Sequence, residues 1–93
     1  MIKSFKCKET EKIFNGQKSK KIPPEILKVA KRKLDILHFA YAEIDLIIPP
    51  SNRFEHLKGI LYGYCSIRVN DQFRIVFKFK DGNAEDVKIM DYH

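Results

Sequence analysis

Alternating hydrophobic and polar residues in the second half of the chain predict three β-strands, at residues 64–69, 73–80 and 84–92. Every second side chain of a strand points to the same face. The positions expected to face a core are Cys65, Ile67, Val69, Phe73, Ile75, Phe77, Phe79, Val87 and Ile89. The strands are separated by two turn-like sequences, Asn70-Asp71-Gln72 and Asp81-Gly82-Asn83. We therefore expect an antiparallel meander.

The first half of the chain follows a helical period instead. Glu9 to Phe14 reads as a short helix that ends at Asn15-Gly16, a pair suited to the left-handed conformation of a helix cap. A longer helix is expected from about Glu25 to Tyr41, after Pro23-Pro24, because proline is tolerated at a first helical position. Its apolar stripe repeats at steps of three and four and comprises Leu27, Ala30, Leu34, Leu37 and Tyr41.

The two ends of this helical region complete the fold prediction. Ile2 to Lys6 alternates like a first strand, whereas residues 42–54 are irregular. These elements predict an α+β fold in which an N-terminal strand and two helices pack on an antiparallel sheet with a three-stranded C-terminal meander. A chain of 93 residues buries one core, and no linker divides it, so residues 1–93 are expected to form a single domain.

Charge and composition narrow the class of partner. The net charge of +6 and the pI near 9.4 favour an anionic partner, with nucleic acid ahead of a membrane surface, although solubility alone explains the charge equally well. The first residues lack the apolar stretch of a secretory signal. The longest apolar run, Leu46-Ile47-Ile48, is too short to cross a bilayer. We expect a cytoplasmic protein that makes no membrane contact.

The cysteines and histidines show no metal-binding spacing. Cys7 and Cys65 are isolated, which favours two reduced thiols, with Cys65 in the core, over a disulfide or a zinc site. His38, His56 and His93 are too scattered to predict a metal cluster. No metal and no cofactor are therefore expected.

Polar positions on the middle strands suggest a phosphate-binding surface. Tyr64, Ser66, Arg68 and Arg74 lie outside the core set and are expected to face outward together. Arginine suits phosphate because its planar group donates two parallel hydrogen bonds. The competing interpretation is that both arginines are solvated strand residues paired with acids.

Two further segments supply groups that transfer protons. Residues 52–59 contain Arg53, Glu55, His56 and Lys58 in an irregular segment, and loops of this kind often carry function. The last predicted strand ends in Asp91-Tyr92-His93, where alternation places Asp91 and His93 on one side and Tyr92 on the other. His56 is interpreted as a bystander.

These groups match the needs of metal-free RNA cleavage. The 2′-hydroxyl must lose a proton, the charge on the phosphate must be stabilised, and the 5′-oxygen must gain a proton. Glu55 or His93 could transfer the protons, and Tyr92 could orient the substrate. The candidate charge-stabilising residues are Lys58, Arg68 and Arg74.

Three ordered blocks make the chain resemble the HigB branch of the RelE toxin superfamily over nearly its whole length. The blocks are Asn52-Arg53-Phe54-Glu55-His56-Leu57-Lys58-Gly59, Ser66-Ile67-Arg68-Val69-Asn70-Asp71-Gln72-Phe73-Arg74-Ile75 and Asp91-Tyr92-His93, and Met1-Ile2-Lys3-Ser4-Phe5 also fits. The resemblance implies a bacterial type II toxin that cuts messenger RNA in the ribosomal A site. It implies a helix-turn-helix antitoxin similar to HigA, and binding to operator DNA only through the toxin–antitoxin complex.

The resemblance also assigns residues. It places Lys58, Arg74, Asp91, Tyr92 and His93 in the active centre, with Glu55 in a loop where some members carry histidine. Arg53, Tyr64, Ser66 and Arg68 are the expected contacts to RNA or the ribosome. Two departures stand out: Ile60-Leu61 replaces an acidic-basic pair, which would weaken phosphate contact, and Cys65 and Phe73 replace tryptophans.

Two other functions stay open at this point. One is an attenuated toxin homologue that binds the ribosome or the antitoxin without cutting RNA. The other is a basic structural scaffold unrelated to translation.

Overall fold

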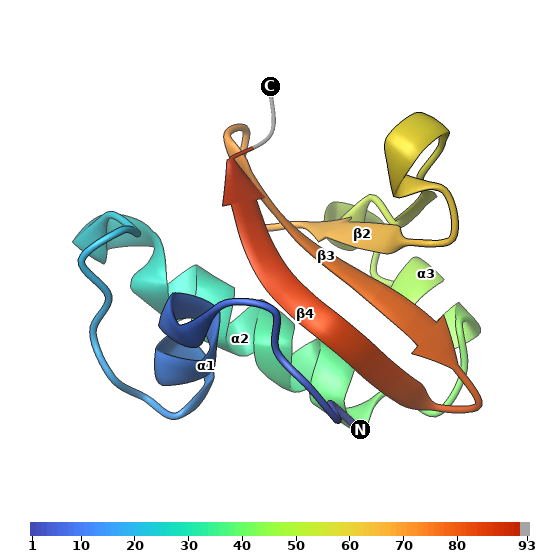
Figure 1. Cartoon of the computed structure of the whole chain (residues 1–93), viewed down its shortest axis with the longest axis horizontal. Coiled ribbons are helices and arrows are strands. Elements are labelled where there is room, and N and C mark those ends of the chain that lie inside the picture. Colours follow the sequence, from blue (N-terminus) through green and yellow to red (C-terminus); the bar gives the residue numbers. More distant parts are fainter. Residues whose placement is uncertain (92–93) are drawn as a thin grey trace.

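A four-stranded antiparallel sheet organises the computed structural model, which describes residues 1–91. The strands follow one another in chain order as β1 (Glu55–His56), β2 (Cys65–Arg68), β3 (Phe73–Lys80) and β4 (Asn83–Asp91). The helices α1 (Lys8–Phe14) and α2 (Pro24–Phe39) lie on one side of this sheet (Figure 1). The expected α+β architecture and meander are confirmed, and the two-residue strand β1 is an addition that the sequence did not predict.

The helix ends follow local backbone chemistry. At the end of α1, Gly16 adopts φ +83 and its N–H bonds to the Ile13 carbonyl, as predicted for an Asn-Gly stop. The expectation that α2 reaches Tyr41 is wrong. Ala40 already has an extended conformation (φ −72, ψ 131), and the Tyr41 side chain is 89% exposed. Tyr41 matches the spacing of the apolar stripe but lies beyond the helix.

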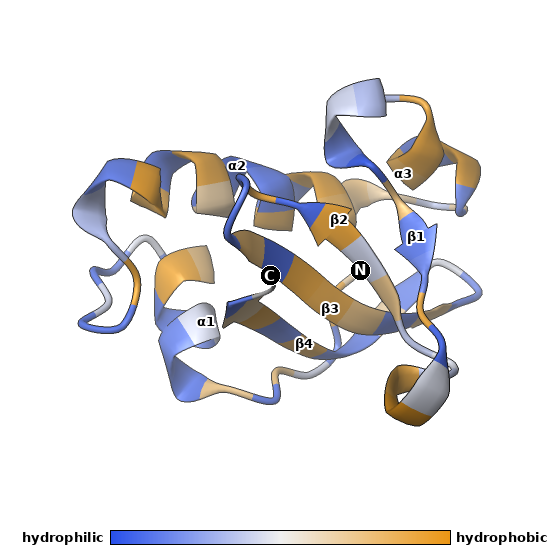
Figure 2. Ribbon diagram, turned by 90° about the horizontal axis from the view of Figure 1, so that it is seen from above, coloured by the Kyte–Doolittle hydropathy of each residue, from blue (hydrophilic) through white to orange (hydrophobic). Residues whose placement is uncertain are grey.

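The core lies between α1, α2 and the inner face of the sheet. Hydrophobic and hydrophilic residues alternate along α2, and the middle of β3 is hydrophobic (Figure 2). The strands β2, β3 and β4 contribute alternate side chains to this layer, so that burial of apolar surface drives the docking of helices on sheet. The buried cluster comprises Ile13, Ile22, Ala30, Leu34, Leu37, Ala40, Leu46, Cys65, Ile67, Val69, Phe73, Ile75, Phe77, Ala84, Val87 and Ile89.

A buried lysine connects α2 to the segment that leads into the sheet. Lys33 is only 3% exposed, and its Nζ donates a 2.6 Å hydrogen bond to Asn52 Oδ1. Asn52 closes the 3-10 turn η1 (Pro50–Asn52) and donates from Nδ2 to the carbonyl of Leu46 in α3 (Ile44–Ile47). Burial, together with the charges of Arg32 and Arg68, lowers the pKa of Lys33. These hydrogen bonds fix residues 44–52, which the sequence predicted to be irregular.

The β3–β4 hairpin turns at Asp81 and Gly82, as predicted. Both residues have positive φ, +52 and +78, which is the requirement of a two-residue type I′ turn. A side chain at Gly82 would bring its Cβ within 2.9 Å of the Tyr41 carbonyl oxygen. Glycine is therefore required at this position both by its conformation and by the closeness of the backbone after α2.

The N-terminal segment runs beside β4 but does not form the full strand expected from Ile2 to Lys6. Two isolated parallel bridges join it to the sheet, Ile2 to Ala84 and Phe5 to Val87. Between these bridges β4 is bulged at Asp86, a non-glycine residue with φ +54, whose N–H bonds to Ser4 Oγ. The bulge interrupts the ladder, so the N-terminal pairing stays discontinuous.

No helix in residues 1–91 combines the length and the apolar character that crossing a bilayer requires.

Candidate functional site

The candidate residues of the middle strands share the sheet face that points away from the helices. In the β1–β2 and β2–β3 pairs, Glu55 lies opposite Ser66, and Arg68 lies opposite Arg74. Residues paired across antiparallel strands share a face. We call the surface that carries Glu55, Ser66, Arg68 and Arg74 the open face. Figure 1 shows the turn around residue 60 running into the start of β2.

Arg74 is held rigidly within the open face. Its Nε donates a 2.8 Å hydrogen bond to Ser66 Oγ, and one terminal nitrogen donates a 2.5 Å bond to the carbonyl of Arg53. Arg53 adopts a left-handed conformation (φ +44) as η1 ends. The expectation that Ser66 and Arg74 face solvent is wrong, since Ser66 is fully buried and Arg74 is 8% exposed. The Arg53 segment and β1 flank them at the sheet edge.

Glu55 lies beside this guanidinium. Its carboxylate Oε1 is 3.6 Å from a terminal nitrogen of Arg74, and the Glu55 side chain is exposed. A fixed cation and an accessible carboxylate therefore meet at the edge of the open face. This arrangement brings together a charge that stabilises phosphate and a group that accepts a proton, two of the three requirements for RNA cleavage.

The other two candidates near the middle strands, Arg68 and Tyr64, have partners of their own. Arg68 forms an ion pair with Asp71 in the β2–β3 turn, which partly supports the interpretation of a strand arginine paired with an acid. Tyr64 precedes β2, and the ammonium groups of Lys6 and Lys78 lie 5.5 and 5.1 Å from its ring centre. Exposed pairs of this kind contribute little stability. Arg68 thus lies next to Arg74, whereas Tyr64 lies among lysines further along the sheet.

Of the remaining active-centre candidates, Lys58 and Asp91 belong to the described residues. Lys58 is exposed and immediately precedes the 3-10 turn η2 (Gly59–Leu61). Asp91 pairs with Phe73 at the end of β4, on the helix-facing side of the sheet, and accepts a 3.1 Å hydrogen bond from Gln72 Nε2. Tyr92 and His93 lie outside the described residues.

A cluster that the sequence did not predict lies at the edge of the helix-facing side. His56 lies opposite Cys65 in the β1–β2 pair, with 3.5 Å between His56 Nδ1 and Cys65 Sγ. Glu43, which precedes α3, contacts His56 Nε2. Burial, and secondarily the Glu43 charge, raises the pKa of the Cys65 thiol to about 11. His56 and Cys65 are nine residues apart in sequence, and only the strand register brings them together.

The cysteines otherwise agree with the sequence analysis, because Cys7 and Cys65 are both free and Cys65 is buried.

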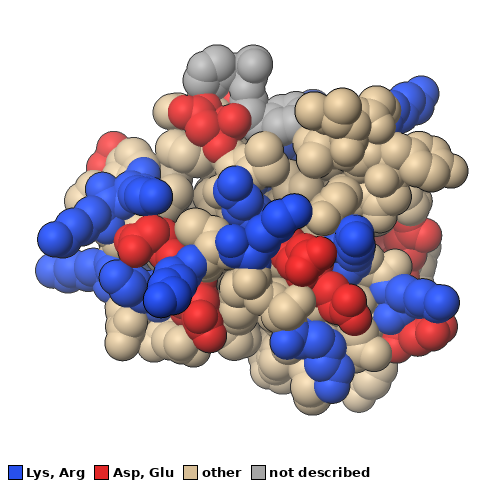
Figure 3. All heavy atoms as spheres, viewed as in Figure 1, with Lys and Arg blue, Asp and Glu red and all other residues tan. Residues whose placement is uncertain are grey.

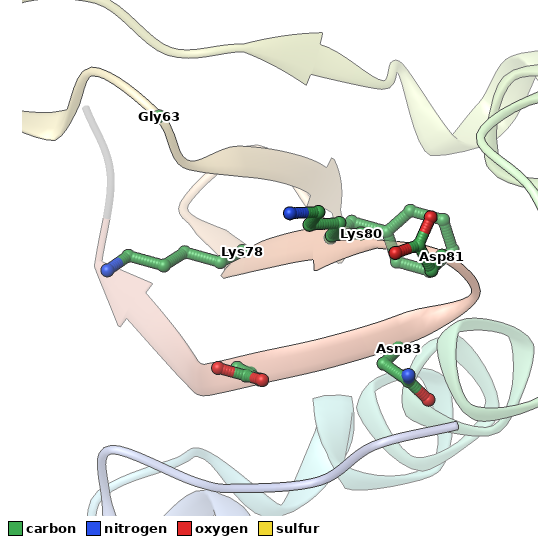
Figure 4. Close-up of a pocket in the computed structure, with 7 residues that line it drawn as sticks. Gly63, Lys78, Lys80, Asp81 and Asn83 are labelled. Atoms are coloured by element: carbon green, nitrogen blue, oxygen red, sulfur yellow. The ribbon is translucent and has the colours of Figure 1, made fainter.

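Positive and negative side chains are mixed on the face of the molecule that Figure 3 shows, where Lys and Arg are interleaved with Asp and Glu. A hollow of about 500 Å³ lies between Gly63 and the β3–β4 hairpin, where Lys78 and Lys80 project from β3 (Figure 4). Arg74 does not line this hollow. The Glu55–Arg74 pair therefore lies apart from this hollow.

Comparison with known proteins identifies relatives of the whole chain. A family model described as the RelE-like toxin HigB of type II toxin–antitoxin systems matches residues 3–93. The chain is 51% identical over 85 residues to toxin HigB-1 of Vibrio cholerae, covering 90% of each protein. It is 32% identical over 93 residues to endoribonuclease HigB of Proteus vulgaris, covering 100% of each.

Similarity also extends to a solved structure. The crystal structure of the heterotetrameric YoeB–YefM toxin–antitoxin complex from Staphylococcus aureus contains a chain that superposes with a TM-score of 0.60. The match covers 100% of this chain and 95% of that one, at 23% sequence identity. At that identity the likeness concerns the fold.

Proposed function

The chain belongs to the HigB-like family of RelE-like toxins from type II toxin–antitoxin systems, and from this premise we propose that it is an endoribonuclease that cleaves messenger RNA in the ribosomal A site. The endoribonuclease name of the Proteus vulgaris relative supports an RNA-cleaving activity. The observation that carries the proposal is the Glu55–Arg74–Ser66 arrangement on the open face.

The reaction we propose is attack of the RNA on itself. A base removes the proton of the 2′-hydroxyl, the 2′-oxygen bonds to the adjacent phosphorus, and the bond from phosphorus to the 5′-oxygen breaks. The departing 5′-oxygen takes a proton from an acid, and the products are a 2′,3′-cyclic phosphate and a 5′-hydroxyl. Protein groups supply each of these functions, so this scheme needs no metal ion.

Arg74 would supply the charge that stabilises the transition state. Its contacts to Ser66 and Arg53 orient the guanidinium before RNA arrives, so little reorganisation is needed during the reaction. Burial also reduces screening of its charge by water, and this strengthens its field at a phosphate above the open face. Lys58 and Arg68 are proposed to add positive charge around the same phosphate.

Proton transfer is assigned to Glu55 and His93. Glu55 is exposed beside Arg74, where a 2′-hydroxyl next to the bound phosphate would lie within its reach. His93 would serve as the second group, since an unperturbed imidazole both gains and loses protons near neutral pH. Tyr92 would orient the substrate, and Asp91 would help to position the end of the chain. Arg53 and Tyr64 are assigned to the surroundings of the RNA, whereas the buried Ser66 would act only by orienting Arg74.

The partners follow from the family. We propose that a cognate helix-turn-helix antitoxin neutralises the toxin in the cytoplasm and that the pair represses its own operon. Operator DNA would be bound only through the antitoxin.

One observation favours a second candidate, an attenuated homologue that occupies the ribosome without cutting RNA. Ile60 is fully exposed in η2, at the position where the family pattern has a charged pair. Loss of a cation next to Lys58 would weaken the hold on phosphate.

Primer extension on a message being translated in vitro separates the two functions. The endoribonuclease proposal predicts new RNA ends at the A-site codon with the wild-type chain and their loss with Arg74→Lys or Lys58→Ala, at unchanged circular dichroism. Lys80→Ala, an exposed change at the far end of β3, is the matched control and should retain cleavage. Stalled ribosomes carrying uncut RNA would support the attenuated homologue, and cleavage at the wild-type rate by both site variants would overturn the catalytic assignment.

A further inference from the structure

Three side chains of metal-binding type meet at the β1–β2 edge, on the side of the sheet opposite Arg74. They come from separate segments: Glu43 precedes α3, His56 belongs to β1, and Cys65 begins β2. One ligand atom from each lies within 4.8 Å of the other two. From this geometry we propose that Glu43, His56 and Cys65 bind a transition-metal ion of the zinc type.

The distance between Cys65 Sγ and His56 Nδ1 matches the spacing of two ligands of one zinc ion. In a tetrahedral zinc site, a sulfur at about 2.3 Å and a nitrogen at about 2.1 Å from the ion lie about 3.5–3.6 Å apart. Cys65 Sγ and His56 Nδ1 are 3.5 Å apart. The β1–β2 register holds His56 and Cys65 opposite each other, so these two ligands are already positioned by the backbone.

Glu43 supplies the third candidate ligand atom, the carboxylate oxygen Oε1. This oxygen is shielded from solvent and contacts Nε2 of the His56 ring, a contact that forms an ion pair only when the imidazole is protonated. Next to a neutral imidazole the shielded carboxylate would need another cationic partner, and a bound metal ion would supply one. A small rotation of the Glu43 side chain, which is partly exposed, would bring this oxygen to the spacing of a third ligand.

The kinds of ligand select the class of ion. A thiolate and an imidazole disfavour Mg²⁺ and Ca²⁺, which prefer oxygen, and favour Zn²⁺ or Co²⁺. The exposed side chain of His56 leaves an entry path, and a water molecule would complete the coordination. Because the cluster lies on the face opposite Arg74, the ion would hold β1 against β2 and take no part in RNA cleavage.

A cobalt titration of the purified, reduced full-length chain tests the site. Binding of Co²⁺ is expected to produce a thiolate-to-cobalt charge-transfer band and the visible bands of a tetrahedral ion, and added Zn²⁺ should displace both. Cys65→Ser should abolish the charge-transfer band. Cys7→Ser is the matched control, because Cys7 lies outside the cluster, and should leave the band unchanged.

Cys65 is a core residue, so Cys65→Ser could fail to fold. Glu43→Gln is therefore a second variant, because Glu43 lies outside the core and its replacement should leave the fold intact. We expect it to weaken Co²⁺ binding by about tenfold or more, because loss of a residue that merely orients a ligand already costs about 10–100-fold in metal affinity. A wild-type chain without a thiolate band would overturn the proposal, and so would equal affinities of the wild type and Glu43→Gln. The titration contains no RNA, so its outcome is independent of the endoribonuclease proposal.

Discussion

The side chains of Arg74 and Ser66 are joined by a 2.8 Å hydrogen bond between Nε and Oγ, formed diagonally across the β2–β3 pair. The serine is fully buried, so its hydroxyl has no competing water. The bond therefore fixes the plane of the guanidinium relative to the sheet. Under the proposed function, the orientation of Arg74 depends on a residue that never touches RNA.

Ser66→Ala tests this positioning role. The variant should lose about 1 kcal/mol of unfolding free energy, the usual worth of one hydrogen bond. Because Arg74 would no longer be aligned, we expect its rate of messenger RNA cleavage to fall about ten- to a hundredfold. Ser66→Thr keeps the γ-oxygen and should recover most of the rate. Wild-type cleavage by Ser66→Ala, measured per folded molecule, would show that the bond has only a structural role.

Lys33→Met tests the buried connection between α2 and η1. The change keeps a long side chain but leaves the buried Asn52 Oδ1 without its 2.6 Å donor, so we expect a loss of about 1–3 kcal/mol in urea unfolding. Lys31→Met on the same helix is the control. Lys31 pairs with Asp35 at the surface, and its replacement should change stability by less than about 0.5 kcal/mol. Equal effects of the two changes would contradict a special role for Lys33.

The lowered pKa of Lys33 also makes stability depend on pH. Between its folded-state pKa and the ordinary value of 10.5, the unfolded chain keeps a proton that the folded chain has released. Because the unfolded state binds more protons there, the contribution of Lys33 to the unfolding free energy rises with pH. The wild type should therefore gain stability relative to Lys33→Met between neutral pH and this alkaline window. If the difference in unfolding free energy between the wild type and Lys33→Met does not change with pH, the lowered pKa of Lys33 is contradicted.

Gly82→Ala should destabilise the domain more than Gly16→Ala does. Both glycines have positive φ, +78 and +83, so either change costs about 1–2 kcal/mol for the left-handed backbone. At Gly16 a Cβ meets open space, whereas at Gly82 it meets the Tyr41 carbonyl oxygen at 2.9 Å. The backbone must shift there, at a further cost of about 1–3 kcal/mol. Thermal unfolding of the two variants measures the difference, and equal losses would mean that the contact relaxes freely.

Alkylation rates should distinguish the two thiols of the metal-free chain. Partial burial raises the pKa of Cys7, but the backbone N–H groups of Thr10 and Glu9 at the start of α1 bring it below 9.0 overall. Burial holds the pKa of Cys65 near 11. Since the thiolate is the reactive form, we expect iodoacetamide to modify Cys7 first at mildly alkaline pH. Peptide mass spectrometry of the wild type and Cys7→Ser would check this, and faster labelling of Cys65 would contradict its burial.

Much of the fold is predictable because its strands are long enough to show a period. Phe73, Ile75 and Phe77 alternate over the length of β3 and are all buried as expected. The secondary-structure predictions fail where a strand is too short to show a hydrophobic period, or where a residue matches the period by chance. A strand of two residues, β1, shows no periodicity, and Tyr41 repeats the stripe of α2 although the backbone has already become extended at Ala40.

The sequence predicts which residues form the candidate site, but it predicts their burial and hydrogen-bond partners less well. Alternation correctly places Ser66, Arg68 and Arg74 on one face. It cannot show that the backbone at Arg53 turns to accept a bond from Arg74, because that depends on a left-handed residue in an irregular segment. The pairing of His56 with Cys65 likewise depends on the register of a strand that the sequence did not predict.

The short β1 and the N-terminal segment along β4 have a consequence for self-association. An exposed strand edge invites another chain to pair with it, which leads to aggregation. Here one edge of the sheet ends in two residues, and the other is bridged by Ile2 and Phe5 and bulged at Asp86. A second molecule that sought to lengthen the sheet would first have to displace one of these segments. A toxin with edges protected in this way should stay dispersed at high concentration.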